Sequence, residues 1–266
     1  SDELASALYY GPSTSTGDGV IMATADGVNA ATRLMEYGKR YPNGVEVSKG
    51  IAKSTIAGNI TGWTMSAILV NAEGERVVNE KASNRTILEA ELAQTGSELF
   101  LLMDSETFNV WKTKLAAAGL TEESIDGYVA ANGTTTPVFA HGDTLEEVAA
   151  AAGVNGENLV KTVERYNGFV AAGSDEDFGR SADYMTMAIG DGPYYLVEQK
   201  PRFATTMGGL VVNTSLQVEN TDGDVIPGLY AAGEVVGGVM GDDSPSGANN
   251  GWALTAGKLA AEAIAK

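Results

Sequence analysis

The alternation of apolar and polar residues in the middle of the chain predicts strands as well as helices. Residues 63–71 form an apolar run typical of a strand, Glu73-Gly74 marks a turn, and residues 76–80 are expected to return as the partner strand. Residues 99–103 are a second short apolar run, and we expect them to form a further strand. This part of the chain therefore predicts a small sheet.

Apolar residues at helical spacing predict three helices in the same region. The first covers residues 105–118. The second covers residues 144–152 and begins with Thr144 and Glu147 at the spacing of a capping box. The third covers residues 159–171. Strands and helices that follow one another in this way indicate a mixed α/β fold.

The N-terminal block joins a glycine-rich turn to a helical pattern. Thr16-Gly17-Asp18-Gly19 precedes apolar residues whose spacing predicts a helix that ends at Gly38. Asp18 can either cap this helix or hold a hydroxyl group of a ligand. Taken alone, the four residues favour the ordinary cap.

The C-terminal block has the pattern of a nucleotide-binding segment. Residues 228–232 suit a short buried strand, and Gly233 lets the backbone approach a ligand closely. Glu234 then lies at the carboxyl end of that strand, where open α/β sheets bind nucleotides. Residues 241–250 are rich in glycine, aspartate and serine, and they lead into a helix whose N-terminus near Asn249 offers unpaired N–H groups. The alternative is a glycine-rich surface loop before an ordinary helix.

Composition narrows the classes of function. The chain has 266 residues, of which 17 are basic and 35 acidic, and the net charge of −18 argues against nucleic acids and anionic membrane surfaces as partners. The absence of cysteine excludes disulfides and cysteine-ligated metals. No apolar run approaches ~20 residues, so no membrane span is expected. Residues 220–224 lack the later glutamate of a calcium loop and indicate a β-turn, so no metal site is predicted.

Several of these motifs occur in the same order in a known family. The C-terminal run from Met207-Gly208-Gly209, through residues 226–234, to Ser246-Gly247-Ala248-Asn249-Asn250-Gly251 closely resembles the end of the fumarate reductase/succinate dehydrogenase-type FAD flavoproteins. Residues 153–167 resemble part of the capping domain of the same family. The resemblance implies FAD as the cofactor and an oxidoreductase as the whole protein.

The resemblance also divides the chain into three parts. Residues 1–39 and 204–266 are expected to be segments of an α/β FAD-binding domain, with residues 40–203 inserted between them as an α+β capping, or clamp, domain that binds substrate. The Gly-x-Gly-x-x-Gly motif that holds the FAD pyrophosphate in the family is absent from the sequence, so we expect a fragment of a longer flavoenzyme. Ser1-Asp2-Glu3-Leu4 has no signal-peptide pattern, and the localisation is left open.

The family's chemistry points to a proton donor. In these enzymes hydride passes from N5 of the reduced flavin to an activated double bond, and an arginine delivers the proton. Gly74-Glu75-Arg76-Val77-Val78-Asn79-Glu80 matches the segment that precedes this arginine and makes Arg85 the candidate, at a spacing one residue longer than the commonest pattern. Tyr41 is the candidate assistant. The alternative for Arg85 is a surface arginine near the start of a helix.

Other groups expected from the family are missing. Ala204-Thr205-Thr206 stands where fumarate reductases have paired histidines, and Ser244 stands where they have a carboxylate-binding arginine. The proton-relay positions fall near Ile60 and Trp63, which cannot move protons. Arg202 is the candidate second cation for a substrate. These departures argue against fumarate itself and favour a larger, less charged enone, aromatic acrylate or steroid-like substrate. A dicarboxylate-like molecule remains the further candidate.

The expected site residues form three groups. The catalytic candidates are Arg85 and Tyr41. The cofactor-binding candidates are Thr16, Gly17, Asp18, Gly19, Thr205, Thr206, Gly233, Glu234, Asn249 and Asn250. The substrate-binding candidates are Ser244, Gly247 and Arg202. The leading hypothesis is an FAD-dependent oxidoreductase that reduces or forms an activated C=C bond, with an electron donor that the sequence does not identify. A non-catalytic folded fragment and a flavin-free ligand-binding module remain as alternatives.

Overall fold

The computed structural model describes residue 4 and residues 6–241, 243–245 and 247–265. Residues 1–3 and Ser246, which belong to segments named in the sequence analysis, therefore lie outside the described residues. The chain divides into two compact units. The central unit comprises residues 6–10 and 41–202, and the flanking unit comprises residues 1–5, 11–40 and 203–266.

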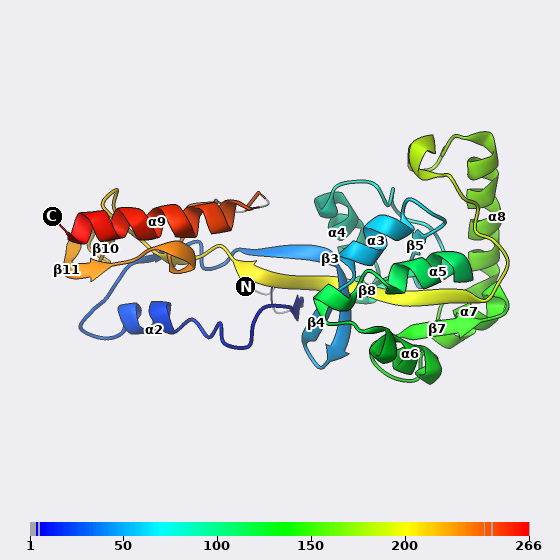
Figure 1. Ribbon diagram of the computed structural model, residues 1–266, viewed down its shortest axis with the longest axis horizontal. Helices are drawn as coiled ribbons and strands as arrows, with labels where there is room; N and C mark the ends of the chain where they lie inside the picture. The colour runs from blue at the N-terminus through cyan, green and yellow to red at the C-terminus, as the bar shows by residue number, and fades with distance from the viewer. Residues whose placement is uncertain (1–3, 5, 242, 246, 266) are drawn as a thin grey trace. The chain divides into compact units, whose positions relative to one another are not determined.

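The central unit is built around a seven-stranded mixed sheet (Figure 1). The strands follow the order β1 (Leu8–Tyr9), β4 (Ile51–Ser54), β3 (Gly38–Ser48), β8 (Tyr194–Thr206), β6 (Leu99–Asp104) and β5 (Ile68–Val70), and β7 (Phe139–Gly142) also pairs with β8. The β1–β4 pairing is parallel. The β3–β4, β5–β6, β6–β8 and β7–β8 pairings are antiparallel. The chain passes between the two units within β3 and within β8.

Strand β6 is buried on both faces of this sheet. Leu99 and Leu101 belong to one hydrophobic cluster together with Trp111, whereas Phe100 belongs to a second cluster together with Tyr166. Neighbouring side chains of a strand point to opposite faces of the sheet, so β6 contributes apolar side chains to both clusters. A strand of this kind has a continuous apolar sequence, and the predicted strand at residues 99–103 is confirmed.

Helices supply the other half of each cluster. The first cluster is completed by α3 (Ile56–Gly62), α4 (Asn84–Leu92), α5 (Ser105–Lys112) and α6 (Glu122–Ala131), and the second by α7 (Leu145–Ala152) and α8 (Gly156–Ala172). The hydroxyl of Thr144 accepts from the Glu147 N–H, and the Glu147 carboxylate accepts from the Thr144 N–H, both at 3.2 Å. The predicted capping box and the two predicted helices at residues 144–152 and 159–171 are therefore confirmed.

Three sequence predictions for this unit are wrong. Residues 63–66 form turns in place of a strand, because the N–H groups of Trp63 and Met65 donate to carbonyls at the end of α3, leaving only β5 from the expected strand. In the segment 76–80, Arg76 makes a single isolated bridge with Val70. Helix α5 ends at Lys112, and a short 3₁₀ turn occupies Ala116–Ala118.

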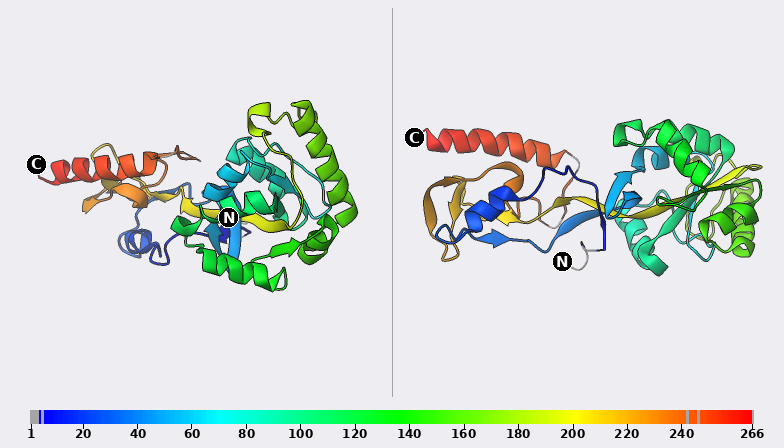
Figure 2. Two further views of the ribbon diagram at one scale, coloured as in Figure 1. Left: turned by 45° about the vertical axis from the view of Figure 1, so that its right-hand side comes forward. Right: turned by 90° about the horizontal axis from the view of Figure 1, so that it is seen from below.

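The flanking unit contains two small antiparallel ribbons and two helices. Strand β2 (Thr32–Arg33) pairs with β9 (Gly209–Leu210), and β10 (Gln217–Glu219) pairs with β11 (Val225–Tyr230). The helices are α2 (Asp18–Thr24) and α9 (Ala248–Ile264), and a 3₁₀ turn, η4 (Gly233–Val235), follows β11. Figure 2 shows α9, in red, running beside the orange β10–β11 ribbon. Ala256 and Ala260 of α9 are buried with Leu216.

The helix predicted at the N-terminal block is shorter than expected. Helix α2 ends at Thr24 because the backbone of Ala25 is extended, with φ of −62° and ψ of 155°. The left-handed conformations of Gly27 and Asn29, with φ of 89° and 56°, prevent the helix from resuming. The strand predicted at residues 228–232 is also not buried as expected. Strand β11 is paired with β10, and most of its side chains are exposed or half-buried. The predicted C-terminal helix is confirmed as α9.

Candidate functional site

Three of the predicted cofactor-binding segments meet around η4 in the flanking unit. A Cβ atom at Gly19 would lie 3.0 Å from Val235 Cγ2, so the start of α2 packs directly against η4. Trp252, in the first part of α9, donates from Nε1 to the Gly233 carbonyl at 3.0 Å. The structure therefore brings together the Thr-Gly-Asp-Gly turn, the Gly233–Glu234 pair and the start of α9.

The N-terminus of α2 leaves a carboxylate exposed. Gly17 is the N-cap residue, with a left-handed φ of 78°, and no side chain caps the helix. Asp18 lies in the first turn, so the prediction that Asp18 caps the helix is wrong. The Thr16 hydroxyl donates to Asp18 Oδ1 at 2.8 Å and holds the exposed carboxylate in place. Asp18 remains accessible to the hydroxyl group of a ligand.

The turn after β11 presents a second exposed carboxylate. Gly233 is buried with a left-handed φ of 75°, a backbone conformation that favours glycine at this position. Glu234 follows on the surface and makes no ion pair with any described residue. A free carboxylate in this position can accept hydrogen bonds from a diol, as the sequence predicts.

The start of α9 is open to a ligand. Gly247 is the N-cap residue with φ of 82°, and no side chain caps the N–H groups of the first turn. Asn249 and Asn250 are exposed in that turn, and Asn249 Nδ2 lies 3.5 Å from Ser244 Oγ. A 17-residue helix with an uncapped N-terminus carries partial positive charge at this end. The arrangement suits the anionic or carbonyl part of a cofactor.

Sequence reasoning missed a cation beside these residues. Lys39 Nζ lies 2.6 Å from Asp243 Oδ1, and it also donates to the Ser244 carbonyl. The signal available in the sequence was the Lys39-Arg40 pair directly before Tyr41. The predicted Thr205 and Thr206 lie at the end of β8 and are half-buried and exposed, respectively, so their hydroxyl groups are accessible.

In the central unit, two predicted site residues lie in contact. The Arg202 guanidinium carbon is 4.8 Å from the centre of the Tyr41 ring and 4.5 Å from that of Tyr10, which the sequence analysis missed. Nε and Nη2 of Arg202 both donate to Asn43 Oδ1, at 2.9 and 2.6 Å. Burial lowers the pKa of Arg202, although Tyr10 and Tyr41 oppose this change. Within the described residues, no carboxylate pairs with this buried cation.

Arg85 lies on a different element from Tyr41 and Arg202. It occupies the first turn of α4, its side chain is 85% exposed, and Nε donates to Glu89 Oε1 at 3.1 Å. This is the surface position near a helix start that the sequence alternative described. Among the described residues, no contact joins Arg85 to Tyr41 or Arg202, and its role as proton donor stays a prediction.

The motif that precedes Arg85 forms a buried ion-pair network. Arg76 donates from Nε and Nη2 to both oxygens of Glu80, at 2.9 and 2.8 Å, and from Nη2 to Asp175 at 2.9 Å. Arg180 Nη1 donates to the same Glu80 carboxylate at 3.2 Å. Burial alone would raise the pKa of Asp175, but hydrogen bonds from Arg76 and from the Arg180 N–H lower it to about 2. The network holds the segment that leads into α4.

Comparison with known proteins adds to this geometry. Residues 1–250 match the model of a family described as FAD binding domain. The chain is 35% identical to the fumarate reductase (cytochrome) of Shewanella frigidimarina over 251 residues. This match covers 94% of this chain and 39% of that protein. The chain belongs to this FAD-binding family. The chain is also 34% identical over 226 residues to the urocanate reductase of Eggerthella lenta, covering 85% of this chain and 34% of the relative.

A solved structure supports the same family. A flavocytochrome c3 fumarate reductase in an open conformation matches with a TM-score of 0.72 and 29% identity, over 99% of this chain and 42% of that one. The predicted family and the mixed α/β fold are thus confirmed. The chain spans less than half the length of these relatives.

The flanking unit fits one side of an FAD site. Two exposed carboxylates and an uncapped helix N-terminus lie around one turn, and Gly17, Gly233 and Gly247 supply its left-handed backbone conformations. The Gly-x-Gly-x-x-Gly loop for the pyrophosphate has no counterpart in the sequence. The part of the chain that the structure describes contains no cluster of three metal-binding side chains. Over the same residues, no helix is long and apolar enough to cross a membrane.

Proposed function

We propose that this chain is a portion of an FAD-dependent oxidoreductase that reduces, or forms, a C=C bond next to an electron-withdrawing group. The observation that carries the proposal is the meeting of the Thr-Gly-Asp-Gly turn, the Gly233–Glu234 pair and the start of α9 around η4. The central unit is the capping domain of this enzyme and binds the substrate.

The residues of the flanking unit hold the cofactor. Glu234 and Asp18 accept hydrogen bonds from its hydroxyl groups, while the hydroxyls of Thr205 and Thr206 offer further contacts. The uncapped first turn of α9, with Asn249 and Asn250, stabilises negative charge on the ring system. When bound, FAD supplies the hydride for the double bond or accepts the hydride removed from it.

Arg202 anchors the substrate in the central unit. It is buried, it has no carboxylate partner in the described structure, and the rings of Tyr10 and Tyr41 flank its guanidinium. A buried cation without a carboxylate partner is stabilised most by a ligand that carries a negative charge or develops one in the transition state. One such anchor suits the single carboxylate of an acrylate or the carbonyl of an enone better than the two carboxylates of fumarate.

Arg85 holds the proton that the substrate carbon receives. Its exposed position on α4 leaves the guanidinium accessible, and Glu89 orients it from one helical turn away. Ser244 and Gly247, at the start of α9, contribute to the substrate site beside the cofactor. The electron donor is a separate domain or protein.

The test combines flavin binding with turnover in the longer gene product that contains this chain. We expect a visible flavin band that survives desalting and reduction of acrylates or enones by a reduced dye. Arg85→Lys and Arg85→Ala should slow turnover by at least 100-fold, since general acid catalysis contributes about 10²–10⁴-fold, and should leave the flavin band unchanged.

Lys258→Ala is the matched control for Arg85→Ala. Lys258 is also an exposed helical cation with an ion pair to a glutamate four residues later, at 3.6 Å. It should retain normal turnover. A protein that binds no flavin would favour the flavin-free module, and normal turnover in Arg85→Ala would eliminate Arg85 as the proton donor.

A further inference from the structure

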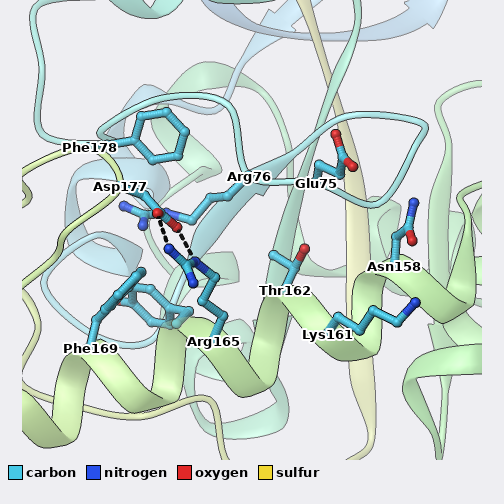
Figure 3. A pocket seen from close by; sticks show the side chains of 10 residues that line it. Glu75, Arg76, Asn158, Lys161, Thr162, Arg165, Phe169, Asp177 and Phe178 are labelled. Carbon is cyan, nitrogen blue, oxygen red and sulfur yellow. Dashed lines mark hydrogen bonds and ion pairs between the residues drawn. The ribbon is translucent and has the colours of Figure 1, made fainter.

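The central unit contains a cavity of about 430 Å³ that plays no part in the proposed flavin chemistry (Figure 3). It lies along α8 and is also lined by the Glu75-Arg76 segment and by the loop that carries Asp177 and Phe178. Its cationic and aromatic lining residues are Arg76, Lys161, Arg165, Tyr166, Phe169 and Phe178. All of them belong to the central unit.

Two polar groups at this cavity are buried and have no hydrogen-bond partner among the residues that the structure describes. Nη1 is the unused nitrogen of Arg76, whose Nε and Nη2 are already taken by Glu80 and Asp175. The hydroxyl of Tyr166 is the second. The Arg76 side chain is 5% exposed and Tyr166 is 1% exposed, so water does not reach either group freely. Buried polar atoms in folded proteins nearly always have a partner.

Both groups act as hydrogen-bond donors at neutral pH. A guanidinium has no lone pair with which to accept a hydrogen bond. Burial is the main cause that raises the pKa of Tyr166, so its hydroxyl keeps its proton. Two donors without an acceptor call for an oxygen atom that can accept from both.

The Arg76 guanidinium is also fixed in place. Its central carbon lies 5.1 Å from the centre of the Tyr166 ring and 5.2 Å from that of Phe178. A cation between two aromatic faces, paired on its other edge with carboxylates, keeps its orientation. Phe178 is 36% exposed and forms part of the cavity wall.

Two further cations stand at the mouth of the cavity. Arg165 pairs with Asp177, with the two bonds at 2.7 and 2.5 Å (Figure 3). Lys161 pairs with Glu157 at 2.6 Å. Both cationic side chains are more than half exposed. Exposed ion pairs of this kind contribute little free energy, so either cation can exchange its partner for a ligand oxygen.

We propose that this cavity binds a small oxyanion, a carboxylate or a phosphate group, through Arg76 Nη1 and the Tyr166 hydroxyl. Lys161 and Arg165 neutralise its charge from the mouth. The site does not depend on flavin or on the proposed reduction. Its ligand can therefore be a different molecule from the substrate.

The test is an NMR titration of the chain with inorganic phosphate and with acetate, against sodium chloride at equal ionic strength. We expect saturable shifts of amides near residues 74–78 and 161–169, and the tighter of the two anions identifies the class of ligand. Tyr166→Phe removes one donor and keeps the ring, and it should weaken binding at least fivefold. Tyr128→Phe, a tyrosine of α6 outside the cavity, should leave binding unchanged.

A second pair of variants covers the case in which Tyr166→Phe does not fold. Lys161→Gln should weaken anion binding, whereas Lys258→Gln, an equivalent exposed helical pair outside the cavity, should not. Shifts that chloride reproduces, or binding that is equal in the wild type and in Tyr166→Phe, would overturn the proposal. Loss of flavin binding in any variant would count against the proposed function only, because the anion site does not depend on flavin.

Discussion

Carboxylates buried in the central unit differ sharply in how they are paired. Glu80 accepts hydrogen bonds from Arg76 and Arg180. Glu91 on α4 is also completely buried, but neither of its oxygens has a hydrogen-bond partner in the described part of the chain. Burial, followed by the nearby Glu98, raises the pKa of Glu91 well above its usual value. Glu91 is therefore most stable in the folded protein as the neutral acid.

Glu91→Gln should stabilise the protein increasingly as the pH rises. A raised folded-state pKa means that the stability due to the bound proton is present below the unfolded pKa and is lost as the pH rises through the folded one. Glutamine keeps the shape and cannot ionise. We expect a gain on the order of 1–3 kcal/mol at pH 9 and almost none at pH 4, measured by urea unfolding.

Glu89→Gln provides the control for Glu91→Gln. Glu89 lies on the same helix with a side chain that is 65% exposed, so its substitution should give a small effect that changes little between these pH values. A Glu91→Gln protein that loses stability relative to the wild type at high pH would contradict the interpretation.

Among the elements, the turn after β5 shows how one glycine fixes the position of a helix. An added Cβ at Gly74 would lie 2.4 Å from the Asn155 carbonyl oxygen at the start of α8. Asn158 Nδ2 donates to the Glu73 carbonyl at 2.9 Å, and the Thr162 hydroxyl donates to the Gly74 carbonyl at 2.7 Å. The turn and the first two turns of α8 therefore form one packed element.

Gly74→Ala should destabilise the protein more than Gly96→Ala. Both glycines have a left-handed φ, of 77° and 74°, but a Cβ at Gly96 would meet nothing within 4 Å. Gly96→Ala should therefore cost only the backbone strain, about 1–2 kcal/mol. Gly74→Ala should lose a further ~1–3 kcal/mol because the backbone of α8 must shift. If urea unfolding gave the same loss of unfolding free energy for Gly74→Ala and Gly96→Ala, the backbone of α8 would be able to move away from the new Cβ at no cost.

The elements that could be predicted from the sequence are those with a local cause. The capping box of Thr144 and the continuous apolar run of β6 both depend on neighbouring residues, and both predictions are confirmed. Residues 63–66 were misread because an apolar run does not distinguish a strand from the end of a buried helix. The helix at Asp18 was predicted too long because apolar spacing outweighed the breaking effect of Gly27.

The candidate site shows the same division. The segments around η4 were predicted because motif order places them in one site, and the structure brings them together. The contact of Arg202 with Tyr10 could not be predicted, because it joins residues almost two hundred positions apart in a segment without a motif. The orphaned donors of Arg76 and Tyr166 also become visible only when the packing of α8 is known.

At the scale of the whole molecule, the two units bury their apolar residues unequally. The flanking unit exposes Leu254, Met22, Ile21 and Ile264, each by more than 60%. In the central unit, α8 buries Leu159, Val163, Tyr166 and Phe169. The relatives are more than twice as long as the chain, so their unmatched part provides enough structure to cover such residues. On the proposed function, in which this chain is a portion of a longer flavoprotein, the flanking unit depends on the remainder for its stability.

Hydrogen exchange of α9 and α8 tests this inference with two helices of equal length. Both have 17 residues, but the buried side chains of α9 are only Ala256 and Ala260. Local stability follows buried apolar contact, so amides of α9 in the isolated chain should exchange at least tenfold faster than those of α8. In the longer gene product with FAD, α9 should become protected while α8 changes little. Equal protection of the two helices in the isolated chain would show that the flanking unit is stable by itself, and the exposed apolar residues would then need another explanation.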